Sequence, residues 1–178
     1  MEFSLKTSES FDEVMRHYTP TVYRIAFTRL GNAADAEDVS QDVFVRYFKA
    51  DLTFESEEHR KAWLLHCAVN CANSFASSAW KRHNRDLEGL EQIPDERSVE
   101  ESAERSEARE SVLKAVMQLP PKYRTVVYLF YFEDLSTMQI SNVIKVREST
   151  VRSQLSRARE QLKKMLKKYR EEAEFDEF

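Results

Sequence analysis

The chain has 178 residues, of which 33% are charged, with a formal net charge of −4, two glycines and four prolines. So few turn-forming residues disfavour a β-sandwich or barrel, and aliphatic residues at spacings of three and four indicate an all-α protein. No apolar run approaches the roughly 18 residues of a spanning helix, and the N-terminus lacks the basic and apolar regions of a secretory signal. We therefore expect a cytoplasmic protein without membrane insertion.

The net charge conceals a segregation along the chain. Residues 84–110 carry 4 basic and 10 acidic side chains, whereas residues 135–170 carry 10 basic and 2 acidic ones. The last eight residues, EEAEFDEF, carry 5 acids. A cationic module flanked by anionic segments points to a polyanionic partner such as nucleic acid.

The first half predicts three long helices. Ser10 and Glu13 form a capping-box pattern, and we expect Pro20 to bend or divide the helix that follows. Gly31 and Asn32 suit the end of that helix and the start of the next one, Ala33 to Lys49. A third helix is expected from His59 to Arg82. Its buried stripe would hold Leu64, Cys67, Ala68, Cys71 and Phe75, and its outer face Asn70, Asn73, Ser74, Ser77 and Ser78.

Two features of this half can be interpreted either as purely structural or as functional. Asp35, Asp38 and Asp42 share one face of the second helix, which is either a solvated face or a docking stripe for a basic partner. Cys67 and Cys71 lie one helical turn apart, where a disulfide fits poorly, so we expect reduced core residues. A zinc site that also uses His66 or His59 is the less favoured alternative, because the rest of a ligand set is missing.

Between the halves, residues 84–107 predict a flexible acidic linker whose end, from about Ala103, merges into a helix. That helix should run to Gln118, where Pro120 and Pro121 stop it. Lys122 to Phe132 is densely apolar and should form the central helix of a second small domain, residues 108–178.

Residues 135–166 predict two helices joined by a tight turn, with Ser136 and Gln139 as a capping box. The second helix places aliphatic residues on one face: Val151, Leu155, Ala158, Leu162 and Met165. Its opposite face carries Arg152, Ser153, Ser156, Arg157 and Arg159. Arginine and serine side chains suit base edges and phosphates, so this pair predicts a DNA-binding helix-turn-helix. A solvated basic helix, or one that binds a membrane surface or a partner, is the alternative.

Taken together, these blocks resemble the extracytoplasmic-function (ECF) sigma factors, the minimal two-domain class of the bacterial sigma-70 family. The resemblance rests on YRIAFTRLGNAADAEDVSQDVFVRYFK and AWLLHCAVNCANSFASSAWKR in the first domain. In the second it rests on LPPKYRTVVYLFYFEDLSTMQISNVI and STVRSQLSRAREQL. It implies a sigma2-like domain (residues 1–83) and a sigma4-like helix-turn-helix domain joined by the acidic linker.

The resemblance also implies roles and partners. Asp35, Asp38, Gln41 and Asp42 match the block that docks on the clamp helices of the largest subunit of core RNA polymerase. Phe54, Asn70, Asn73 and Ser74 fall where the family reads the melted non-template strand of the −10 element. Arg152, Ser153, Ser156 and Arg157 match the −35 reading face, and Arg147, Thr150 and Arg159 are phosphate contacts. Members of the family are commonly held inactive by an anti-sigma factor.

Two residues depart from the family pattern. Lys145 stands where the turn usually has glycine, and a left-handed conformation there would cost about 1 kcal/mol. Arg147 stands at the N-cap of the recognition helix and has no oxygen with which to cap it. The acidic tail matches no role in the family.

The sequence therefore predicts a promoter-specificity subunit that is not an enzyme and needs no cofactor, because no catalytic constellation stands out. The alternatives are a stand-alone helix-turn-helix regulator, a zinc-dependent enzyme or redox sensor using His66, Cys67 and Cys71, and a purely protein-binding bundle. A protein-binding bundle would lack the salt-dependent DNA affinity that phosphate contacts produce.

Overall fold

A computed structural model describes residues 10–79 and 103–176 of the chain. The first part forms α1 (Phe11–Leu30), α2 (Ala33–Ala50) and α3 (Glu57–Ala79). The second part forms α4 (Ala103–Gln118), α5 (Pro121–Tyr131), α6 (Thr137–Ile144) and α7 (Glu148–Asp176). Strands are absent from both parts, which confirms the all-α prediction. Most of the predicted linker lies outside the described residues, and its last residues, 103–107, are already helical.

The predicted start of α1 and the predicted junction of α1 and α2 are confirmed. Helix α3 begins at Glu57, two residues before the predicted His59, and its predicted end at Arg82 lies outside the described residues. Ser10 and Glu13 form a reciprocal capping box at the start of α1. Gly31 is left-handed at φ 72°, and its N–H donates to the Phe27 carbonyl at 2.7 Å. The Asn32 side chain accepts from the Asp35 N–H at 3.0 Å and caps α2. Glycine tolerates the left-handed turn at no steric cost, so two long helices join without a loop.

Pro20 does not divide α1, which continues from Phe11 to Leu30. Proline removes one backbone donor, a cost that favours breaking an isolated helix. Here Tyr18 and Val22, on either side of Pro20, are both buried. Packing on both sides of the proline therefore holds α1 as one continuous helix.

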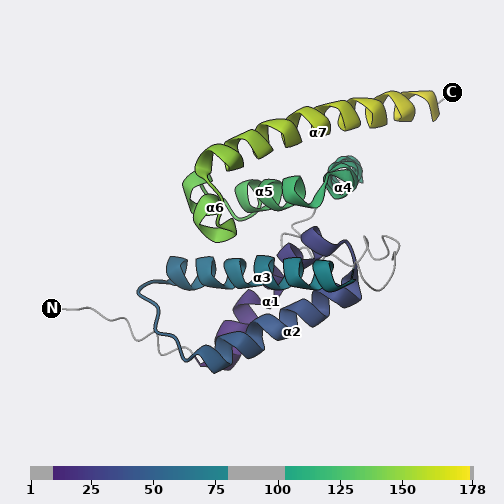
Figure 1. The fold of residues 1–178 in the computed structure, drawn as a ribbon. Helices are drawn as coiled ribbons and strands as arrows, with labels where there is room; N and C mark the ends of the chain where they lie inside the picture. The colour runs from purple at the N-terminus through teal and green to yellow at the C-terminus, as the bar shows by residue number, and fades with distance from the viewer. Residues whose placement is uncertain (1–9, 80–102, 177–178) are drawn as a thin grey trace.

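Helix α5 lies at the centre of the molecule. Seven consecutive residues, 123–129, are buried, so the helix is covered on all sides. It packs against α7 of its own domain and against α1 of the first domain. In Figure 1, α5 lies between α7 above and the α1–α3 layer below. A helix whose whole circumference is buried requires such cover, and α5 buries Arg124 and Thr125 together with its apolar residues.

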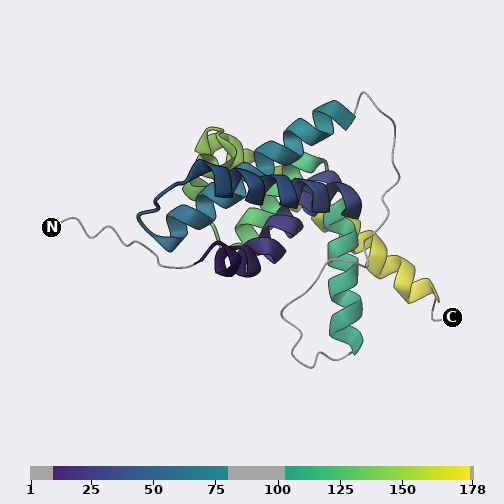
Figure 2. The same cartoon turned by 90° about the horizontal axis from the view of Figure 1, so that it is seen from below.

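The two domains meet at an interdomain interface formed by α1 and α3 on one side and by α5 and α6 on the other. Buried residues of both domains belong to one continuous hydrophobic cluster. The view in Figure 2, from below, shows α4 and the end of α7 extending away from this contact. Within the described residues, no helix is long and apolar enough to cross a membrane.

Candidate nucleic-acid interface

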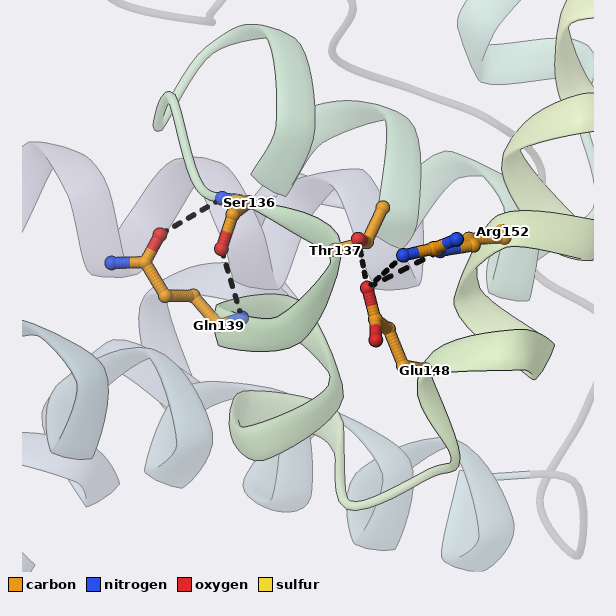
Figure 3. Close-up of polar contacts among 5 residues, drawn as sticks. All are labelled: Ser136, Thr137, Gln139, Glu148 and Arg152. Carbon is orange, nitrogen blue, oxygen red and sulfur yellow. Dashed lines mark hydrogen bonds and ion pairs between the residues drawn. The ribbon is translucent and has the colours of Figure 1, made fainter.

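The helix-turn-helix of α6 and α7 has the predicted cap at the start of α6 and a left-handed residue in its turn. The Ser136 Oγ accepts the Gln139 N–H at 3.2 Å, and Gln139 Oε1 accepts the Ser136 N–H at 2.9 Å, which caps α6 (Figure 3). Lys145 follows α6 in a left-handed conformation, at φ 55° and ψ 44°. The Ser141 hydroxyl donates to the Val146 carbonyl at 2.6 Å and closes the turn. The helix-turn-helix is therefore built with lysine in the left-handed position.

Arg147 occupies the N-cap position of α7, as predicted. Its carbonyl accepts the N–H groups of Thr150 and Val151 at 2.9 and 3.2 Å. These are the first hydrogen bonds of the helix, and the Arg147 side chain is exposed. A cation at this position lies where an incoming phosphate would meet the positive end of the helix dipole.

The amphipathic pattern of the recognition helix is confirmed. Val151, Leu155 and Ala158 are at most 2% exposed and anchor α7 to the domain core. The predicted reading residues lie on the outside: Arg147, Arg152, Ser153, Ser156, Arg157 and Arg159 are exposed, and Thr150 is half-buried. The fold thus presents these polar side chains together on one solvent-facing surface.

Glu148 ties the two helices of the motif together (Figure 3). Its Oε1 accepts from the Thr137 hydroxyl of α6 at 2.5 Å and from Arg152 at 2.8 Å. These bonds lower the pKa of Glu148, with the Thr137 bond contributing most. Arg152 is nevertheless 69% exposed. Its guanidinium is therefore oriented from one side and open to a ligand on the other.

Arg159 lies in an aromatic environment that the sequence did not reveal. Its Nε donates to the Tyr131 hydroxyl at 2.8 Å, and its guanidinium lies 5.3 Å from the Phe130 ring centre. Such stacking fixes a planar guanidinium while its outer edge remains hydrated.

In the first domain, the acidic stripe of α2 faces solvent. Asp38, Gln41 and Asp42 are exposed and Asp35 is half-buried. Asp42 pairs with Arg46 at 2.9 Å, an ion pair in which both side chains are about half exposed. An exposed pair of this kind stabilises the helix little and remains available to a partner.

The predicted single-strand contacts lie on α3. Asn70 and Ser74 are exposed and Asn73 is half-buried. An open hollow of about 490 Å³ is lined by Asn73, Ser74, Ser77 and Ser78. Ser77 and Ser78 donate to the carbonyls of Asn73 and Ser74, which leaves the hydroxyl oxygens at the rim as acceptors.

Phe54 lies apart from this hollow, in an aromatic cluster. The ring is 5% exposed, stacks on Tyr47 at 5.9 Å and meets the ring of Trp63 edge-on at 6.1 Å. A ring buried in this way supports the loop before α3 but offers little surface for stacking a base.

Both asparagines are also tied to the second domain. Asn70 Nδ2 lies 2.9 Å from His66 Nε2, and His66 Nδ1 lies 2.5 Å from the Val143 carbonyl of α6. One tautomer satisfies both contacts, with Nδ1 donating and Nε2 accepting. Arg29 Nε donates to Asn73 Oδ1 at 2.7 Å, and Arg29 Nη1 donates to the Thr125 hydroxyl of α5 at 3.4 Å. The predicted −10 residues thus border the interdomain interface.

The two cysteines are core residues, as predicted. Cys67 and Cys71 are 9% and 5% exposed, with their sulfur atoms 4.0 Å apart. The bond to Cys67, together with burial, raises the pKa of Cys71. In the described part of the chain, three or more potential metal ligands do not come together.

The sequence did not predict several residues that position the proposed DNA-binding side chains. Only the Glu148–Arg152 pair left a signal, the helical spacing of four between opposite charges. His66 and Arg29 act through contacts with residues 77 and 96 positions away, which no local pattern announces.

The fold and its surfaces define a two-domain helical DNA-binding protein with a helix-turn-helix in the second domain. The family pattern described as Sigma-70 region 2 matches residues 14–82, and Sigma-70, region 4 matches residues 109–162. The chain therefore belongs to the sigma-70 family, and its relatives are ECF sigma factors.

Two relatives and one solved structure illustrate the similarity. ECF RNA polymerase sigma factor SigW of Bacillus subtilis (strain 168) is 26% identical, with 89% of this chain and 90% of that protein covered. ECF RNA polymerase sigma factor SigE of Mycolicibacterium smegmatis is 32% identical, with 92% of this chain and 64% of that protein covered. The sigma factor RpoE of Bartonella quintana, solved with the anti-sigma factor NepR, shares the fold. Its TM-score is 0.68 at 20% identity, with 88% of this chain and 96% of that chain covered.

Proposed function

We propose that this chain directs transcription initiation as the promoter-specificity subunit of RNA polymerase, with the residue roles given below. The observation that carries this proposal is the presence of both family regions in order in one chain. A stand-alone helix-turn-helix regulator would need only the second region, so the match over residues 14–82 favours the sigma factor.

In the second domain, the exposed face of α7 reads the −35 element. Arg152, Ser153, Ser156 and Arg157 enter the major groove, where arginine pairs with guanine and serine suits either base or phosphate. Arg147, Thr150 and Arg159 contact phosphates and set the register. Exposure of the arginines, and the anchoring of the opposite face in the core, support this assignment.

In the first domain, Asn70, Asn73 and Ser74 contact the non-template strand of the −10 element. The hollow on α3 is open, and its asparagine and serine side chains can form hydrogen bonds with an unstacked base. Phe54 takes a supporting role, because its buried ring holds the loop that precedes α3.

The acidic stripe of α2 docks on a basic surface of core polymerase, the clamp helices of the largest subunit. Asp35, Asp38, Gln41 and Asp42 provide the charge and hydrogen-bond acceptors. Beside them, Val45 and Phe48 are 47% and 69% exposed. An acidic stripe next to exposed apolar side chains is the composition expected of a protein interface.

The remaining assignments follow from the same role. The protein works in the cytoplasm, where polymerase and promoter are, and performs no chemistry of its own. An anti-sigma factor is its regulatory partner, since the related RpoE structure contains the anti-sigma factor NepR.

Run-off transcription with core polymerase across a promoter library tests the proposal. The wild-type chain should select one family of promoters, and Arg152→Ala with Arg157→Ala should relax the preference at the −35 element by about tenfold or more. Lys164→Ala is a matched control, because Lys164 is an exposed cation on the same helix that pairs with Glu160 at 3.1 Å. Unchanged promoter selection in the double variant would contradict the −35 assignment, and no selective transcription at all would contradict the function.

A further inference from the structure

Arg124 is a buried cation without an anionic partner among residues 10–79 and 103–176. Its side chain lies in the first turns of α5 and is 6% exposed. Within the described residues, its buried Nε atom makes no hydrogen bond, and Nη1 lies 4.0 Å from the sulfur of Met117. A buried guanidinium normally has a carboxylate or several carbonyl groups around it, because an uncompensated charge is costly away from water.

A second arginine approaches the same place from the first domain. Arg29 of α1 donates through Nη1 to the Thr125 hydroxyl, the residue after Arg124, at 3.4 Å. Burial lowers the pKa of both arginines, and the charge of Arg29 lowers that of Arg124 further. The interdomain interface therefore holds two neighbouring cations that disfavour each other.

No acid in the described part of the chain neutralises this pair. Neither Arg29 nor Arg124 forms a salt bridge there. One carboxylate at this interface, Glu133, accepts from the Tyr128 hydroxyl at 2.8 Å and pairs with Lys61 at 2.8 Å. The negative charge of Glu133 is therefore already neutralised by Lys61.

The end of α5 adds to the positive charge. Its N-cap residue, Pro120, makes no side-chain capping bond, and the first turn contains no acidic residue. Helix N-termini favour anions, and side chains of a helix point back toward its N-terminus, so the Arg124 side chain extends toward this end. The first turn instead carries Lys122.

The Arg29 end of this cluster borders an open surface of the first domain. Asn73, whose Oδ1 accepts from Arg29, lines the open hollow of about 490 Å³ on α3. Because Asn73 uses its oxygen for Arg29, its NH₂ group remains a donor. Beside the hollow, the cluster therefore offers the Asn73 amide as a donor, with the Arg29 guanidinium bound to the oxygen of the same side chain.

We propose that a phosphate dianion, free or as the terminal group of a nucleotide, binds at the N-terminal end of α5 between Arg29 and Arg124. Guanidinium groups pair with phosphate through two parallel hydrogen bonds, and the positive end of the helix dipole supplies a further attraction. Bound there, the phosphate bridges the first and second domains. The ligand site is separate from the recognition helix, and Asn73 at its edge is also one of the −10 contacts assigned above.

The test compares sodium phosphate with sodium chloride at constant ionic strength and pH 7, using the full chain. Phosphate should raise the melting temperature with increasing concentration, because a ligand of the folded state stabilises it by mass action, and chloride should not. Calorimetric titration with phosphate and with a nucleoside diphosphate identifies the source: tighter binding of the diphosphate indicates a nucleotide and equal binding indicates free phosphate. Either result supports the site.

Two variants separate a ligand site from a structural arginine. Arg29→Gln should weaken phosphate binding about tenfold or more, since a charged hydrogen-bonding partner is lost. In chloride, Arg29→Gln should melt at or above the wild-type temperature, because an opposing charge has been removed. Arg16→Gln, which removes an exposed cation from the same helix, should bind phosphate like the wild type.

If Arg124→Gln folds, it should also bind phosphate more weakly than the wild type. If it does not fold, the test rests on Arg29→Gln. If phosphate fails to stabilise the wild-type chain beyond chloride, or stabilises Arg29→Gln equally, the proposal is overturned. A lower melting temperature of Arg29→Gln in chloride, with phosphate binding unchanged, shows a structural arginine and also overturns it.

Discussion

At the scale of single residues, Glu148 joins the two helices of the DNA-binding motif through Thr137 and Arg152. These bonds hold the pKa of Glu148 below its ordinary value of 4.5. A carboxyl whose pKa is lower in the folded than in the unfolded state stabilises the fold above its unfolded pKa. This contribution is lost as the pH falls through the lowered value.

We therefore expect Glu148→Gln to lower the melting temperature at neutral pH and to match the wild type once the pH is well below 4.5. Melting curves from pH 3 to 7 measure this difference. Glu160→Gln is the control, because Glu160 forms its ion pair with Lys164 on an exposed surface. If Glu148→Gln lowers the melting temperature by the same amount at every pH, the charge of Glu148 contributes nothing to stability.

At the scale of helices, the turn after α6 depends on one left-handed lysine. Lys145 has φ 55°, a conformation that strains any side chain with a Cβ and strains β-branched ones most.

Lys145→Gly should keep the free energy of unfolding or raise it by up to about 1 kcal/mol, and Lys145→Val should lower it by about 1–2 kcal/mol. Urea denaturation measures both changes. Asn142→Val, on an exposed site of α6, controls for the β-branched side chain itself. Equal effects of glycine and valine at Lys145 would show that the turn is not under strain.

The exposed stripe of α2 belongs to the same scale, because its residues act through one helix face. Asp38→Asn with Asp42→Asn should weaken binding to core polymerase by about tenfold or more, and the loss should shrink at high salt. A titration of labelled chain with core polymerase at two salt concentrations measures it. Glu55→Gln, an exposed acid outside α2, should bind normally. Equal affinity of the stripe variant and the wild type would remove α2 from the docking surface.

At the scale of the whole molecule, the interdomain interface includes residues that contact the proposed −10 binding surface. Asn70 connects through His66 to the Val143 carbonyl of α6. Lys61 pairs with Glu133, whose side chain is only 7% exposed. Removing one partner of such a pair leaves a buried charge unpaired, which costs about 3–5 kcal/mol when both partners are fully buried.

Lys61→Met should therefore shift the chain toward a more open arrangement, with a larger radius of gyration in small-angle scattering and tighter binding of a −10 single strand. Arg46→Met is the matched control, since its pair with Asp42 is about half exposed on both sides and contributes little. A compact Lys61→Met variant with unchanged strand affinity would show that the ion pair does not hold the domains together.

By itself, the sequence determined the local structure and the face of each helix. Periodic aliphatic residues, the caps at Ser10, Asn32 and Ser136 and the glycine at Gly31 act within a few residues, so their signals survive in the linear chain. The same locality made the exposed reading face of α7 predictable.

Only the tertiary structure decided how the domains meet and what that contact engages. The contacts of Arg29 with Thr125 and of His66 with Val143 join residues 96 and 77 positions apart. Phe54, predicted as a base contact, is buried by Tyr47 and Trp63 from two different helices. Contacts between distant segments depend on how the helices pack against one another, and this packing produces no periodic pattern in the sequence.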